Sequence, residues 1–120
     1  MIVGTGIDIV EFQRIEKVIE RQPRFISRIL TSREQEIMST LSKQRQLEYV
    51  SGRFAIKEAF AKAYGSGIGS KLNWKDVEVL QQPSGAPMVV CAKIDDSIHI
   101  HVSISHSNSH GIGQVILERR

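Results

Sequence analysis

The spacing of apolar residues predicts a strand followed by a helix at the start of the chain. Residues 1–10 are rich in Ile and Val, carry glycine at positions 4 and 6, and predict a strand. From about Glu11 to Leu30, apolar residues recur at helical intervals and predict a helix. Proline has no backbone N–H to donate, so Pro23 is expected to kink or divide this helix.

Two further helices are predicted from capping signals and from length. Thr31 and Glu34 stand in the register of a capping box, so one helix is expected to start near Ser32. A long helix is expected from about Gln44 to Tyr64. It is expected to stop at the glycine-rich segment 65–69, because glycine readily adopts the conformation that ends a helix.

The second half of the chain changes to short extended segments. Strands following one another through short turns favour an antiparallel sheet. The sequence therefore predicts one α+β domain over residues 1–120, with helices packed on one face of a small antiparallel sheet. The expected strands are Val77–Leu80, Met88–Lys93, Ile98–Ile104 and Gly113–Glu118.

Composition narrows the class of protein. With 120 residues, 41% hydrophobic and 24% charged, the chain fits one globular domain. No apolar run approaches the ~20 residues of a membrane span, and the first residues lack the basic region of a signal peptide. We therefore expect a cytoplasmic protein without a membrane partner. The lone Cys91 excludes an internal disulfide and is expected to be a buried thiol.

The chain carries 16 Lys and Arg against 13 Asp and Glu, a net charge of +3. This sign suits an acidic protein, a nucleic acid or a phosphorylated ligand. A stripe of basic residues on the first predicted helix carries only positive charge, and Val18 and Phe25 lie at its border. It suits an acidic helix or a polyanion, although a solvated face would look the same. Its members are Arg14, Lys17, Arg21, Arg24 and Arg28, if the helix continues past Pro23.

Two carboxylates interrupt apolar segments. Asp8 lies inside the first strand, and Glu58 falls on the same arc of the long helix as Leu47. A buried carboxylate is costly unless it is paired or bound to a metal. Lys62, one turn beyond Glu58, could neutralise it directly. Alternatively, Asp8 and Glu58 converge and hold Mg²⁺ together with phosphate oxygens and water.

Other polar segments carry weaker signals. Segment 65–69 is not a P-loop, because no Gly-Lys-Ser/Thr follows and it comes after a helix. His99 and His101 alternate along one strand and are expected on its solvated face. No Cys and His set has the spacing of a zinc site, and no G-x-S-x-G elbow is present.

Three separated motifs resemble the holo-[acyl-carrier-protein] synthases, a family of 4'-phosphopantetheinyl transferases. They stand in the family's order, and the likeness covers nearly the whole chain. The motifs are Gly4-x-Gly6-Ile7-Asp8-Ile9, then Gly52-Arg53-Phe54-Ala55-x-Lys57-Glu58-Ala59-Phe60-x-Lys62-Ala63 running into Gly65-x-Gly67, and His101-Val102-Ser103-Ile104-Ser105-His106.

The resemblance implies transfer of phosphopantetheine from coenzyme A to a serine of apo-acyl carrier protein. The other product would be adenosine 3',5'-bisphosphate, and the reaction would support fatty acid biosynthesis. It implies Mg²⁺ bound by Asp8 and Glu58, with Lys62 close to the bridging pyrophosphate. It also implies a homotrimer with sites between neighbouring subunits.

The resemblance further assigns two binding surfaces. The coenzyme A site would comprise Arg53, Lys62, Gly65, Gly67, Ile68, Pro87, Ser105, His106 and Ser107. The carrier protein would dock on Arg14, Arg21, Arg24, Phe25 and Arg28.

The base that takes the serine proton stays open. Glu58 and a water on the metal ion are candidates, and Lys62 is one only if desolvation lowers its pKa. His106 is expected to hold a phosphate rather than act as the base. The sequence departs from the family at residues 110–113, where two glycines should loosen the last strand, and at Ala86, where relatives often carry Lys.

Two rival functions fit less well. A non-catalytic basic module for nucleic acid would suit the charge, but aromatic residues make up only 6% and no stacking motif is present. It would also leave Asp8 and Glu58 unexplained, so no nucleic-acid partner is expected. A Mg²⁺-dependent phosphohydrolase would need more carboxylates converging on metal than the sequence places.

Overall fold

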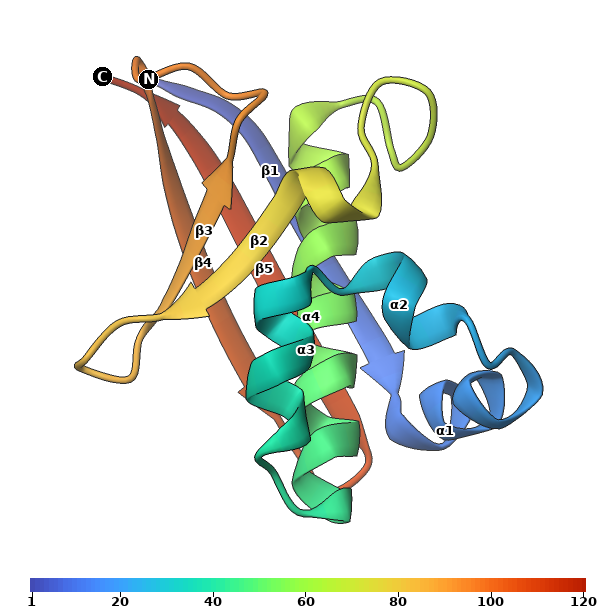
Figure 1. Ribbon diagram of the computed structural model, residues 1–120. Helices are drawn as coiled ribbons and strands as arrows, with labels where there is room; N and C mark the ends of the chain where they lie inside the picture. The colour runs from blue at the N-terminus through green and yellow to red at the C-terminus, as the bar shows by residue number, and fades with distance from the viewer.

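One long helix, α4, lies at the centre of the structure between a sheet and an arm of shorter helices (Figure 1). The computed structural model describes residues 1–120 and confirms the predicted α+β class, with helices on one face of a small antiparallel sheet. The elements in chain order are β1 (Ile2–Glu11), α1 (Phe12–Arg21), α2 (Phe25–Ile29), α3 (Ser32–Ser39), α4 (Lys43–Tyr64), the 3-10 helix η1 (Trp74–Asp76), β2 (Val77–Gln81), β3 (Pro87–Cys91), β4 (Ile98–His106) and β5 (His110–Arg119).

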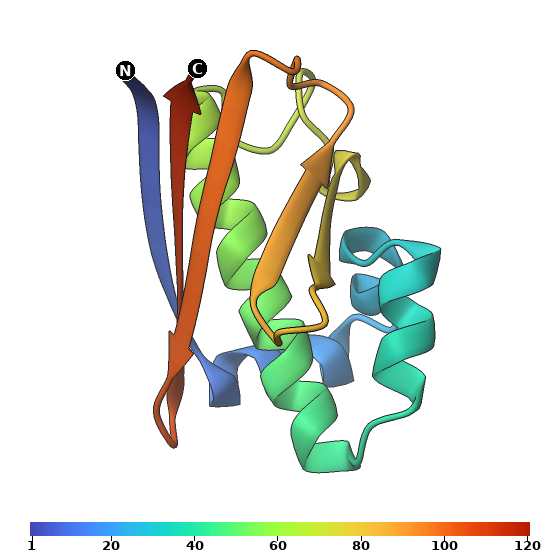
Figure 2. The same ribbon diagram turned by 90° about the vertical axis from the view of Figure 1, so that its left-hand side faces the viewer.

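The strands form two separate antiparallel sheets. β5 pairs with β1 on one side and with β4 on the other, giving the order β1-β5-β4. Figure 2 shows these three strands side by side, with α4 against one face. β2 and β3 form a hairpin of their own. The four strands predicted in the second half are therefore present but do not share one sheet, since β4 and β5 pair with β1 while β2 and β3 pair only with each other.

Glycines allow α4 to lie directly on the sheet. A Cβ at Gly6 would overlap the carbonyl oxygen of Ala59 in α4. A Cβ built at Gly113 of β5 would lie 2.8 Å from the backbone carbonyl carbon of Ala55. β5 pairs regularly with both neighbours from His110 onward, so the glycines near its start do not loosen the strand as predicted. Gly113 instead makes room for the helix backbone.

The predicted first helix is two helices. α1 ends at Arg21, and α2 starts at Phe25, after Pro23. The basic stripe was predicted for a continuous helix and is therefore divided between α1 and α2. α3 has the predicted capping box, in which the Thr31 side chain and the Glu34 side chain each accept a backbone N–H from the other residue.

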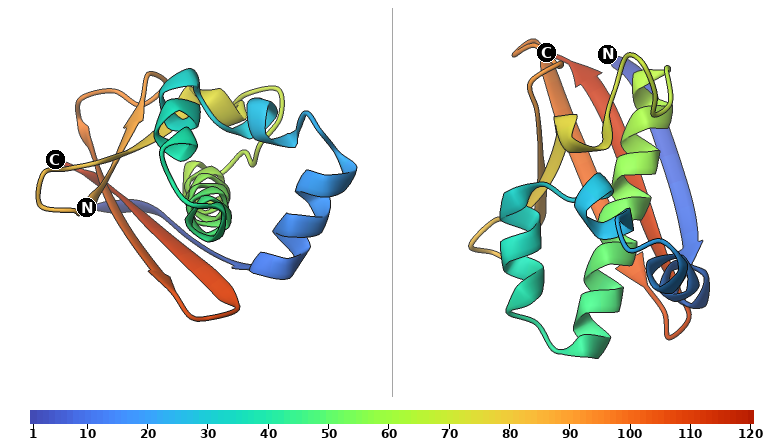
Figure 3. Two further views of the ribbon diagram at one scale, coloured as in Figure 1. Left: turned by 60° about the horizontal axis from the view of Figure 1, so that its bottom comes forward. Right: turned by 45° about the vertical axis from the view of Figure 1, so that its right-hand side comes forward.

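The long helix matches its prediction within one residue, from Lys43 to a left-handed cap at Gly65. It is buried on most sides, because the sheet, the arm and the hairpin all pack around it; Figure 3 shows it nearly end on. The buried residues of α4 are therefore not confined to the arc that Leu47 and Glu58 share. Cys91 is buried, as predicted. None of the helices combines the length and the hydropathy that a membrane span requires.

Candidate functional site

A pocket of about 240 Å³ opens between β1, α1 and α4 and contains both predicted carboxylates. Its other lining residues are mainly apolar, with one arginine. The lining residues are Asp8, Ile9, Val10, Arg14, Ile15, Val18, Phe25, Phe54 and Glu58. The structure thus brings Asp8 and Glu58, which are fifty positions apart in the sequence, into one pocket.

The close contact between β1 and α4 explains why the two carboxylates meet. Asp8 follows Gly6 by two residues, so both lie on the same face of β1, toward the helix. Glu58 precedes Ala59, whose carbonyl lies against Gly6. Asp8 of β1 also pairs with Gly113 of β5. Because Gly113 has no side chain, nothing separates the sheet from the helix at this position.

Lys62 pairs with Asp8 and not with Glu58. Its Nζ lies 3.1 Å from Oδ1 of Asp8 and donates a hydrogen bond of 2.8 Å to the carbonyl of Ile7. The direct Glu58–Lys62 ion pair that the helical spacing suggested is therefore absent. The reason is that Lys62 reaches across to the edge strand rather than back along its own helix.

The surroundings of Glu58 in the pocket change the pKa of its carboxyl group. Burial raises the pKa of the Glu58 carboxyl, and the nearby charge of Asp8 raises it further. Lys62 opposes this shift through its positive charge but does not remove it. Two carboxylates thus share a pocket with one half-exposed ammonium group as their neighbour. A cation bound between them would relieve their mutual repulsion.

The donor set suits one kind of metal. No cluster of three or more His, Cys, Asp or Glu side chains able to hold a metal is present. A closed zinc site is therefore not formed. Mg²⁺ commonly binds through one or two carboxylates and completes its shell with water and substrate phosphates. Asp8 and Glu58 fit that pattern.

The residues predicted for coenzyme A do not converge within one chain. The Arg53 guanidinium stacks on the ring of Tyr49 in the same helix, with its carbon 3.9 Å from the ring centre. Gly65 caps α4, and Gly67 and Ile68 follow in the loop at the upper end of α4 (Figure 1).

The remaining coenzyme A candidates lie at the other end of the molecule. Pro87 begins β3, directly after the hairpin turn. Ser105 and His106 end β4, and Ser107 lies in the turn to β5. There the Ser107 hydroxyl accepts hydrogen bonds from the backbone N–H groups of Ser109 and His110. The two groups of candidate residues thus lie apart along α4 (Figure 1).

The predicted docking residues lie on the arm formed by α1 and α2. Arg14 lines the carboxylate pocket, Arg24 is the N-cap of α2, and Arg28 lies in its last turn. Phe25 is only 8% exposed, so it is a buried residue lining the pocket and not a projecting anchor. Its ring packs against Phe54, with ring centres 5.9 Å apart.

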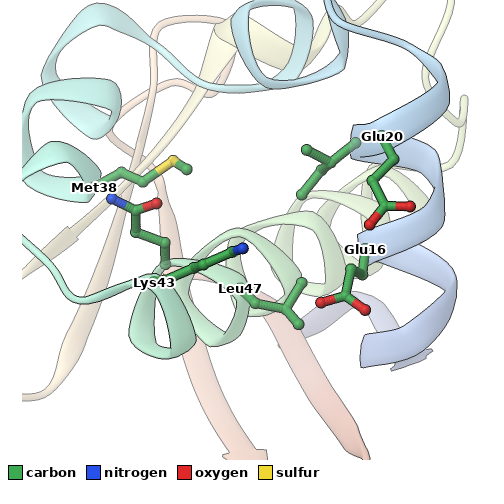
Figure 4. Close-up of a pocket in the computed structure, with 7 residues that line it drawn as sticks. Glu16, Glu20, Met38, Lys43 and Leu47 are labelled. Atoms are coloured by element: carbon green, nitrogen blue, oxygen red, sulfur yellow. The ribbon is translucent and has the colours of Figure 1, made fainter.

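A second pocket, of about 210 Å³, lies between α1, α3 and α4 (Figure 4). It combines three apolar side chains with two carboxylates from α1 and one lysine from α4. None of its lining residues was a candidate site residue. They are Glu16, Ile19, Glu20, Met38, Lys43, Gln46 and Leu47.

Comparisons with known proteins place the chain in a family. The model of the 4'-phosphopantetheinyl transferase superfamily matches residues 4–115. A holo-[acyl-carrier-protein] synthase of Halalkalibacterium halodurans is 56% identical over 119 residues, which cover 99% of this chain and 98% of the relative. One of Shouchella clausii is 52% identical over 98% of this chain and 99% of the relative.

Solved structures of such synthases have the same fold. That of Bacillus anthracis, in complex with coenzyme A (3',5'-ADP), has a TM-score of 0.91 at 42% identity and covers 100% of this chain and 99% of its own. That of Helicobacter pylori, in complex with coenzyme A, has a TM-score of 0.82 at 34% identity and covers 95% of this chain and 99% of its own.

Proposed function

Because the chain belongs to the holo-[acyl-carrier-protein] synthase family of the 4'-phosphopantetheinyl transferase superfamily, we propose how this enzyme performs its transfer. Its substrates are coenzyme A and apo-acyl carrier protein, and its products are the holo carrier protein and adenosine 3',5'-bisphosphate. The observation that carries the proposal is the meeting of Asp8 and Glu58 in one pocket that Arg14 also lines. The holo carrier protein would serve fatty acid biosynthesis in the cytoplasm.

Asp8 and Glu58 would hold Mg²⁺. The shared pocket and the raised pKa of Glu58 support this role, since a divalent cation removes the repulsion between the two carboxylates. When bound, Mg²⁺ neutralises negative charge on the pyrophosphate oxygens of coenzyme A. Because Asp8 and Glu58 sit on different elements, the contact between β1 and α4 fixes their spacing.

The transfer needs one proton acceptor and one cation from the chain. The serine oxygen of the carrier protein forms a bond to the β-phosphorus, and the bond from that phosphorus to the bridging oxygen breaks. Glu58 accepts the serine proton, because its carboxylate lines the pocket toward which the serine is directed. Lys62 turns from Asp8 toward the leaving phosphate and offsets its charge.

Coenzyme A would bind between subunits of a homotrimer. The separation of the candidate residues at the two ends of α4 supports this arrangement. A second support is the outer face of β1 and β5, which carries apolar side chains away from α4. Ile7 is 58% exposed and Ile9 is 61% exposed, and Ile9 pairs with Ile112, itself 37% exposed. Association of copies through this face would bury these side chains.

The carrier protein would dock on the arm. Arg14 offers positive charge in the pocket, and Arg21, Arg24 and Arg28 carry the same charge along α1 and α2, which suits an acidic helix. Arg14 lines the same pocket as Glu58, so a helix held there delivers its serine to the carboxylates. Phe25 and Val18 supply apolar lining to that pocket.

The test is the intact mass of an apo-acyl carrier protein incubated with the enzyme, coenzyme A and Mg²⁺. We expect a gain of one phosphopantetheine, lost when EDTA replaces Mg²⁺. Glu58→Gln serves as the matched variant, because it keeps the size of the side chain and removes its charge. Transfer in EDTA, or by Glu58→Gln at the rate of the unchanged enzyme, would contradict the metal site.

A further inference from the structure

A fully buried ion pair joins α4 to α3. Lys57 of α4 and Glu34 of α3 have no exposed side-chain surface, and the Lys57 Nζ lies 2.7 Å from Oε1 of Glu34. Burial lowers the pKa of Lys57, and the Glu34 carboxylate opposes that shift. None of the steps of the proposed transfer uses either residue.

The pair also anchors three backbone segments. Lys57 donates a second hydrogen bond, of 2.6 Å, to the carbonyl of Ile29, the last residue of α2. Glu34 accepts the backbone N–H groups of Thr31 and of Val79 in β2, each at 2.8 Å. One ammonium and one carboxylate therefore tie the end of α2, the start of α3 and the hairpin to α4.

The Ile29 carbonyl explains why the lysine is needed there. The last carbonyls of a helix have no partner within the helix. Ile29 is only 1% exposed and Leu30 is fully buried, which puts the end of α2 out of reach of bulk solvent. A helix of five residues is also too short to keep its position without tertiary contacts.

The position of Lys57 in α4 links this anchor to the reaction. Lys57 precedes Glu58, and successive residues of a helix point about 100° apart. Lys57 therefore reaches α2 and α3, while Glu58 lines the carboxylate pocket. α2 in turn contributes Phe25 to that pocket and carries Arg28 in its last turn.

We propose that Lys57 and Glu34 are positioning residues of the transfer reaction. Their buried ion pair holds α2 at a fixed place relative to Glu58, so that the carrier protein binds with its serine directed at Asp8 and Glu58. This inference rests on the proposed function. Stability alone does not account for the pair, because apolar residues of similar volume often replace buried ion pairs without loss of stability.

The test is the double variant Glu34→Gln/Lys57→Met, which removes both buried charges at nearly constant volume. The glutamine oxygen can accept only one of the two backbone N–H groups that Oε1 and Oε2 of Glu34 hold, and methionine cannot bond the Ile29 carbonyl. We expect a folded protein whose KM for apo-acyl carrier protein rises at least about tenfold, while its KM for coenzyme A stays within about twofold. Lys43→Met, at the exposed start of α4, is the control for loss of a lysine from this helix.

A second readout does not depend on turnover. Trp74 is the only tryptophan, and its ring stacks on Phe54, which packs against Phe25 of α2. We expect displacement of α2 in the double variant to shift the fluorescence emission of Trp74. If the unchanged enzyme transfers nothing, the proposed function fails, but the Trp74 emission still tests the position of α2.

The outcomes divide clearly. A folded double variant with an unchanged KM for the carrier protein and unchanged Trp74 emission would overturn the proposal, and the pair would then be only structural. If the double variant does not fold, Glu34→Asp decides, because it keeps the charge but shortens the side chain by one methylene. A rise in the KM for the carrier protein alone supports the proposal, and an unchanged KM overturns it.

Discussion

Gly6 in β1 lies so close to Ala59 in α4 that the carbonyl oxygen of Ala59 occupies the place where a side chain at position 6 would begin. No side chain separates the strand from the helix at this point. Asp8 follows two residues later on the same face of β1, and Glu58 comes one residue before Ala59. A backbone contact between β1 and α4 thus brings the two carboxylates into one pocket.

Gly6→Ala is expected to destabilise the protein by about 3 kcal/mol, because the added methyl meets backbone that has no room to move. Urea unfolding measures this change. Gly69→Ala is the matched control, since a Cβ there meets nothing within 4 Å. The control should change the free energy of unfolding by less than about 1 kcal/mol. Equal effects of the two substitutions would show that the close contact does not limit stability.

Glu58→Gln is expected to abolish Mg²⁺-dependent transfer and, without divalent cations, to raise the melting temperature at pH 7. Burial and Asp8 raise the pKa of Glu58 above its ordinary value of 4.5. A group with a raised pKa in the folded state costs stability once it ionises, so the cost is absent below pH 4.5 and appears as pH rises through the folded pKa. Thermal unfolding at pH 4 and pH 7 should show variant and wild type converging at the lower pH. A lower melting temperature for the variant at pH 7 would contradict the repulsion between Asp8 and Glu58.

Much of the fold could be predicted from local signals. The capping box of Thr31 and Glu34, the break at Pro23 and the glycine after Tyr64 each act within a few residues, and each boundary was found. The pairing of Asp8 with Glu58 in one pocket was an open alternative, because it depends on which strand α4 crosses. The motif resemblance favoured it, and the packing of Gly6 on Ala59 explains it.

What the sequence did not predict depends on long-range contacts. The spacing of Lys62 suited a partner in its own helix, yet its partner Asp8 lies on another element. The sequence predicts Glu34 as a capping residue, but its bond to Lys57 spans 23 positions and needs α3 to pack on α4. A lysine within a buried stretch of helix was the available signal for this pair, because a buried ammonium requires a partner.

Lys62→Met is expected to lower turnover about 100-fold, because it removes a positive charge from the leaving phosphate. The ion pair with Asp8 leaves the Lys62 side chain 52% exposed, so its loss should change the free energy of unfolding by less than about 1 kcal/mol. Steady-state kinetics and urea unfolding measure the two effects. Lys62→Arg is the control that keeps the charge, and full turnover by Lys62→Met would exclude a role for this ammonium.

Ile9→Arg is expected to convert the proposed trimer into monomers. It places a charge on an outer-face position that is 61% exposed in the single chain and pairs with Ile112. Light scattering after size-exclusion chromatography measures the mass of the particle. Ile37→Arg, at an exposed position of α3, is the control for adding a charge elsewhere. A trimer that survives Ile9→Arg would assign the interface to another face.

Arg14→Glu is expected to raise the KM for apo-acyl carrier protein at least about tenfold and to leave the KM for coenzyme A nearly unchanged. Arg14 lines the pocket that holds Asp8 and Glu58, whereas Lys17 on the same helix does not. Lys17→Glu makes the same change in net charge and is therefore the matched control. A general effect of charge would move both variants equally and would weaken as salt is added. Only a larger rise in this KM for Arg14→Glu than for Lys17→Glu, measured at equal ionic strength, assigns the contact with the carrier protein to the Arg14 guanidinium. An unchanged KM in Arg14→Glu would exclude Arg14 as a docking contact.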